Sequence, residues 1–91
     1  MNEAAIRSTI KDIIASVAGL DQQRIGDEAL LRDDLDLDSL SLLEIAVEVE
    51  LAFHMQLPDE RYRDVASLPQ MVALVSHHLR ETAAAEAGRG R

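Results

Sequence analysis

The chain has 91 residues, which suits one small domain with a modest hydrophobic core. It carries 17 acidic residues against 9 basic ones, for a formal charge of −8. This acidic balance argues against binding to nucleic acid or to an anionic membrane surface, because both require clustered Lys and Arg. The absence of cysteine excludes a disulfide-stapled fold, so the thiol of any thioester chemistry would have to come from a cofactor. With no signal peptide and no membrane-spanning apolar run, we expect a cytoplasmic monomer.

The first part of the chain has the pattern of an amphipathic helix. Apolar residues recur at helical spacing at Ile6, Ile10, Ile13, Ile14 and Val17. This predicts a helix from about Glu3 to Val17, which Gly19 ends. The following stretch, residues 20–37, is rich in aspartate and has no sustained period, so we expect a long connection. Its leucines are expected to drop into the core and anchor it; they are Leu30, Leu31, Leu35 and Leu37.

A second helix is predicted from Ser39 to about His54. Asp38 is a candidate N-cap, which would place Ser39 at the first helical position, beside the positive end of the helix dipole. Two apolar lines run along this helix, one through Leu40, Leu43, Val47 and Leu51, the other through Leu42, Ile45, Val49 and Phe53. A small core cannot bury such a wide arc, so part of it should face a partner or line a cavity. We expect Leu43 to lie in the core.

The rest of the sequence predicts two further helices. Asp59 and Glu60, after Pro58, should begin a short helix that ends near Asp64. Ser67 should cap the last helix, whose apolar face contains Leu68, Met71, Val72, Val75 and Leu79. The predicted fold is therefore all-α: a small four-helix bundle with three longer helices, one short third helix and a long first loop. We expect the domain to span residues 1–82 and residues 83–91 to form a disordered tail.

The segment from Asp33 to Glu44 resembles the acyl carrier protein family. In that family an Asp-Ser-Leu triplet opens the second helix, and here Asp38-Ser39-Leu40 stands at that place. The similarity covers about residues 3–79 and has no gap from the loop through Pro58-Asp59-Glu60. Other positions that match the family are Leu31, Leu35, Leu43, Glu44, Val47, Phe53 and Leu57. Asp36 departs from the pattern, because the family usually has glycine there, and a positive φ would suit aspartate less well.

The resemblance implies a non-catalytic carrier that a phosphopantetheinyl transferase modifies on Ser39, using coenzyme A. The attached 4′-phosphopantetheine arm would hold acyl intermediates as thioesters for fatty-acid or polyketide-type biosynthesis. Partners would be acyl-loading, ketosynthase or acyltransferase-type enzymes with basic docking surfaces. The resemblance assigns partner contacts to Asp38, Leu40, Glu44, Val47 and Glu50. It leaves the cargo and the pathway open.

An acidic run supports the docking role. No Lys or Arg interrupts the sequence from Asp33 to Glu60, and keeping so many like charges together favours a basic partner that relieves their repulsion. Two other functions remain open: a peptidyl or aminoacyl carrier of the same fold, and an acidic helical adaptor that has no prosthetic arm.

Metal binding and catalysis are less favoured than the carrier function. Asp34, Asp36 and Asp38 have the first three spacings of a calcium loop, but Ser39 and Ile45 stand where that loop needs glycine and a bidentate glutamate. We therefore assign no metal site. The sequence also has no nucleophile elbow and no candidate oxyanion loop, so we expect no catalytic residue.

Overall fold

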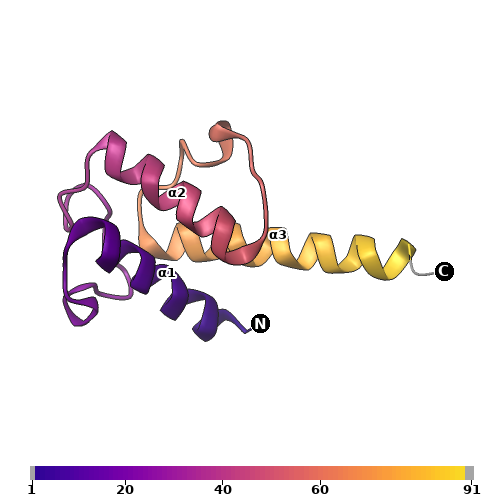
Figure 1. The fold of residues 1–91 in the computed structure, drawn as a ribbon. Coiled ribbons are helices and arrows are strands. Elements are labelled where there is room, and N and C mark those ends of the chain that lie inside the picture. Colours follow the sequence, from indigo (N-terminus) through magenta and orange to yellow (C-terminus); the bar gives the residue numbers. More distant parts are fainter. Residues whose placement is uncertain (1, 90–91) are drawn as a thin grey trace.

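The computed structural model describes residues 2–89, with side chains through Ala83. Its described part contains three α-helices, α1 (Glu3–Ala18), α2 (Ser39–Phe53) and α3 (Leu68–Arg89). Two short 3-10 turns lie in the connections, η1 (Gln22–Arg24) and η2 (Asp59–Arg61). α1 packs against both α2 and α3. The first connection lies at one end of the helices, and the second runs back along α2 to the start of α3 (Figure 1). The all-α class is confirmed.

The four-helix description needs one correction, because the predicted short third helix does not form. The segment is a single 3-10 turn, Asp59–Arg61, rather than a helix that reaches Asp64. Its hydrogen bonds span three residues: the Arg61 N–H donates to the Pro58 carbonyl at 2.9 Å, and the Tyr62 N–H to the Asp59 carbonyl at 3.0 Å. Proline offers no capping side chain, so nothing at this end satisfies the free N–H groups of a longer α-helix.

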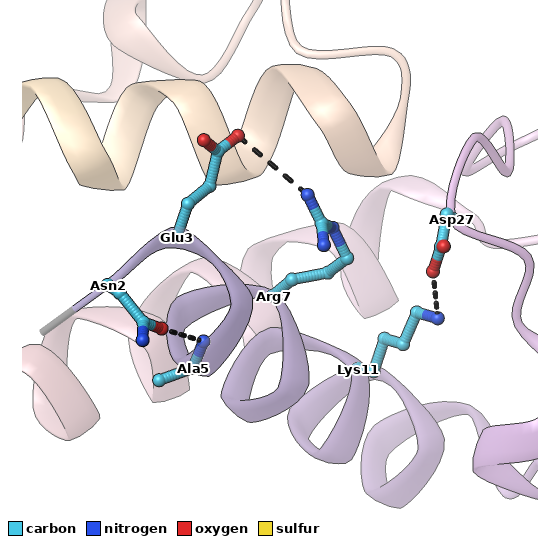
Figure 2. Close-up of polar contacts among 6 residues, drawn as sticks. All are labelled: Asn2, Glu3, Ala5, Arg7, Lys11 and Asp27. Atoms are coloured by element: carbon cyan, nitrogen blue, oxygen red, sulfur yellow. Dashed lines mark hydrogen bonds and ion pairs between the residues drawn. The ribbon is translucent and has the colours of Figure 1, made fainter.

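Local sequence explains where α1 begins and ends. The Asn2 side chain accepts a hydrogen bond from the Ala5 N–H at 2.8 Å and caps the helix (Figure 2). Gly19 ends it in the left-handed conformation, with φ of +69°, which glycine adopts without steric cost. Lys11 on this helix pairs with Asp27 in the first connection, and this hydrogen bond lowers the pKa of the Asp27 carboxyl (Figure 2).

The core follows the predicted apolar lines with two corrections. The interior is formed by Ile6, Ile10 and Ile14 of α1, Ile45, Val49 and Phe53 of α2, and Leu68, Met71, Val72 and Val75 of α3. Leu31 and Leu37 of the first connection are buried beside them, and Leu35 packs against their cluster. Leu30, predicted to be a fourth anchor, is instead 41% exposed.

Leu43 is the second correction, because its side chain is 54% exposed rather than buried. It precedes the fully buried Ile45 by two residues, which is roughly 200° around a helix. With Ile45, Val49 and Phe53 buried in the core, Leu43 must face outward. Of the two apolar lines, the one through Ile45, Val49 and Phe53 is buried.

A backbone connection ties the first loop to the start of α3. The Leu31 N–H donates to the Ala66 carbonyl, and the Leu68 N–H to the Ala29 carbonyl, both at 2.9 Å. Ser67 between them caps α3 as predicted, since its Oγ accepts from the Gln70 N–H at 3.3 Å. This connection fixes the loop just before it enters α2.

α3 is longer than expected and extends beyond the other two helices (Figure 1). Its backbone is helical through Arg89. The tail predicted for residues 83–91 stays a prediction. The domain boundary at residue 82 stays a prediction, and residues 90–91 of the predicted tail lie outside the described residues. None of the described helices combines the length and the hydrophobicity needed to cross a membrane.

Candidate functional site

The site is centred on the start of α2, where Asp38 and Ser39 lie as predicted. The Asp38 carboxylate accepts a hydrogen bond from the Ser41 N–H at 2.8 Å and is therefore the N-cap. This bond holds the pKa of Asp38 below its usual range. Ser39 is the first residue of the helix, and its side chain is exposed. A hydroxyl at this position lies beside the free N–H groups and the positive end of the helix dipole.

The loop before Ser39 turns sharply at Asp36. This residue has φ of +54°, in the left-handed region that favours glycine. The turn is closed by two backbone hydrogen bonds, from the Asp36 N–H to the Arg32 carbonyl at 3.0 Å and from the Leu37 N–H to the Leu31 carbonyl at 3.1 Å. The position therefore does require the positive φ that suits aspartate less well than glycine, and the turn brings the chain back on itself ahead of α2.

This turn brings Arg32 to Ser39. Arg32 Nη2 donates a hydrogen bond to Ser39 Oγ at 3.1 Å, across seven residues. Sequence reasoning missed this contact, although one signal was present: Arg32 is the single Lys or Arg between Asp27 and Glu60. A lone cation in an acidic loop next to a candidate modification site was the clue.

An open groove of about 420 Å³ begins at Ser39. Leu42 and Ala46 of α2 form its apolar wall together with Val65 of the connection to α3. Arg32 and Arg63 also line it. The groove therefore joins an apolar surface, an exposed serine hydroxyl and two guanidinium groups.

Glu50 has a different environment from the other acidic residues of α2. Its Oε1 accepts hydrogen bonds from the Tyr62 hydroxyl at 3.0 Å and from the Leu57 N–H at 3.2 Å. Burial, together with this carboxylate, raises the pKa of the Tyr62 phenol. Glu50 thus binds the connection between α2 and α3 to the helix, while the sequence assigned it to a charged rim for partners. That partner role stays a prediction.

The remaining predicted partner residues lie on the surface. Leu40 is 64% exposed and Val47 is 47% exposed, and Glu44 is exposed one turn after Ser39. Leu43 adds to the same face, so three large apolar side chains and an acid follow the serine. No group of three or more metal-ligating side chains occurs in the described part of the chain. The Asp34 carboxylate is used inside the loop, where it accepts from the Leu30 N–H at 2.8 Å.

Comparison with known proteins identifies the class of this domain. Residues 8–75 match the family model described as a phosphopantetheine attachment site. The chain is 36% identical over 78 residues to an acyl carrier protein of Rubrobacter xylanophilus, which covers 86% of this chain and 96% of the relative. It is 38% identical over 72 residues to an acyl carrier protein of Chlorobium luteolum, covering 79% and 92%. A relative from Guillardia theta with the same name is 32% identical over 76 residues, covering 84% and 94%.

The fold, the exposed serine at the start of α2 and these matches define a carrier domain with a covalently attached 4′-phosphopantetheine. The chain belongs to the acyl carrier protein family. Its role is to carry acyl groups for biosynthetic enzymes, and it is a substrate of a phosphopantetheinyl transferase. The resemblance found in the sequence is confirmed.

Proposed function

We propose that Ser39 is the residue that carries the 4′-phosphopantetheine arm, transferred from coenzyme A. The observation that supports this most strongly is the exposed Ser39 hydroxyl at the first position of α2, beside an open groove. Helix N-termini favour phosphate groups, because their N–H groups and dipole are positive. Ser41, the other nearby hydroxyl, is half-buried and lies two residues after Ser39, where its N–H donates to the Asp38 carboxylate.

The chain's own residues prepare this attachment. Asp38 fixes the first turn of α2 and so presents the Ser39 hydroxyl to an approaching transferase. Leu42 and Ala46 offer an apolar surface next to it. The attached arm supplies a thiol that forms thioesters with acyl groups. With no catalytic residue assigned, we propose that the protein is not itself a catalyst, and that it works in the cytoplasm for fatty-acid or polyketide-type enzymes.

The exposed part of α2 is the proposed docking surface for these enzymes. Glu44 would attract basic partner surfaces, and Leu40 and Val47 would supply the apolar contacts. Asp38 stands at the edge of this surface. Glu50 contributes by holding the α2–α3 connection, so its own contact with partners would be indirect. Acyl-loading, ketosynthase and acyltransferase-type enzymes are the expected partners.

Mass spectrometry of the intact protein tests the attachment site. After incubation with coenzyme A and a promiscuous phosphopantetheinyl transferase, the wild type should gain one phosphopantetheine. Ser41→Ala should gain the same mass and Ser39→Ala none, since each variant removes one hydroxyl from the same turn. An unmodified wild type, under conditions that load a control carrier, would overturn the proposal and favour an adaptor without an arm.

A further inference from the structure

The groove beside Ser39 contains two guanidinium groups with no assigned role. Arg32 Nη2 lies 3.1 Å from Ser39 Oγ, and Arg63 lines the same groove. Among the side chains that the structure describes, Arg7 and Lys11 form ion pairs, whereas Arg32 and Arg63 form none. The guanidinium groups of Arg32 and Arg63 are therefore available for an anion.

We propose that Arg32, supported by Arg63, forms an ion pair with the phosphodiester of the arm and holds the arm against the groove. This inference rests on the proposed attachment at Ser39. The phosphorus of the arm would be bonded to Ser39 Oγ, the atom to which Arg32 already donates a hydrogen bond. A guanidinium suits phosphate oxygens, because its planar set of N–H donors can bind two of them at once.

The ion pair would offset the negative charge that the arm introduces. The phosphodiester adds a negative charge to a chain that already carries −8, next to the carboxylates of Asp36 and Asp38. Arg32 is the single Lys or Arg in the stretch from Asp27 to Glu60, so this loop has no other cation to offset that repulsion. Asp36 permits the contact, because its left-handed turn returns the chain toward the start of α2.

Arg63 is held at the groove by its neighbours. Tyr62 donates its hydroxyl hydrogen bond to Glu50 of α2, which fixes the segment that carries Arg63. The groove has the apolar side chains of Leu42 and Val65 in its walls, and Asp59 is the one acidic residue that lines it. An arm held there would lie along the protein surface and would be released when a partner's own charges compete for its phosphate.

Phosphorus NMR of the arm-carrying protein tests the ion pair directly, with Arg32→Ala, Arg32→Lys and Arg63→Ala. Arg24→Ala is the matched control, because Arg24 is exposed in η1 and does not line the groove. We expect the phosphodiester resonance of Arg32→Ala to move to the position that it has in the urea-unfolded arm-carrying protein and to narrow. Arg32→Lys should retain part of the wild-type shift, Arg63→Ala should lose part of it, and Arg24→Ala should match the wild type.

A salt series on the wild type and Arg32→Ala supplies a second measurement. Raising NaCl from about 0.05 to 1 M shortens the screening length about fourfold, so the wild-type resonance should move toward that of Arg32→Ala, while the latter stays fixed. A wild-type resonance that ignores salt, or one identical in wild type and Arg32→Ala, would overturn the ion pair. Intact mass, measured first on each sample, separates this result from failure of the proposed function, because only the latter leaves the protein without the arm.

Discussion

Replacing Ile45 with alanine should show how strongly the buried face of α2 supports the fold. Its side chain has 0% exposure and belongs to the core cluster. The change removes three carbons, and about 0.8 kcal/mol for each gives about 2.4 kcal/mol of lost transfer free energy. The cavity left behind adds to this, so we expect the free energy of unfolding to fall by about 2–5 kcal/mol.

Leu43→Ala is the matched control, since it also removes three carbons from α2. The Leu43 side chain is 54% exposed, so its loss should change the free energy of unfolding by no more than about 0.5 kcal/mol. Urea unfolding followed by far-UV circular dichroism measures both variants. For a domain of this size, each kcal/mol corresponds to about 4–8 °C in melting temperature, so the two should separate clearly.

Equal costs for the two variants would refute the assignment of the α2 faces. So would a cost below about 1 kcal/mol for Ile45→Ala, because a fully buried isoleucine cannot lose three carbons so cheaply. The comparison requires equal dependence on urea concentration in both variants, which indicates that they expose the same surface on unfolding.

Three further predictions concern the loop and the docking surface. Asp36→Gly should raise the free energy of unfolding by up to about 1 kcal/mol, because glycine adopts the positive φ of this position without strain; an unchanged or lower value in urea unfolding would contradict this. The folded-state pKa of Asp38 is lowered, so its stabilisation is complete above its unfolded pKa and is lost as pH falls through the folded value. Wild type should therefore lose more stability between about pH 5 and pH 3 than Asp38→Asn, and parallel profiles would exclude this role. Glu44→Lys should slow acyl loading by a partner enzyme at low salt and match the wild type at about 1 M salt, while Asp12→Lys on α1, with the same change in charge, should load normally; equal effects of the two variants would show that Glu44 lies on a merely solvated surface.

Much of the fold was predictable because its signals are local. Asp38 and Ser67 precede apolar helical patterns and cap them through residues three positions on, so sequence spacing alone located both helix starts. The candidate site benefited in the same way. The position of Ser39, directly after the N-cap, is determined locally by the first turn of α2.

The features that the sequence predicted wrongly, or did not predict, depend on contacts between residues far apart in the chain. Both apolar lines of α2 have helical spacing, and only the packing of α2 against α1 in the shared core decided that Leu43 faces outward. Glu50 looked like one more acid in a charged run, until the fold brought Tyr62 to its carboxylate from twelve residues away. Arg32 reaches Ser39 because Asp36 turns the loop, a step that sequence periodicity does not encode.

Peptide mapping of the loaded protein tests the central claim most directly. Trypsin should cut after Arg32 and Arg61 and release residues 33–61, a peptide that contains both Ser39 and Ser41. Fragment ions that divide this peptide at Leu40 separate the two serines. We expect the fragments that end at Ser39 to carry the phosphopantetheine mass, and those that begin at Leu40 to lack it. The added mass on fragments that begin at Leu40, or on another peptide, would contradict the assignment of Ser39.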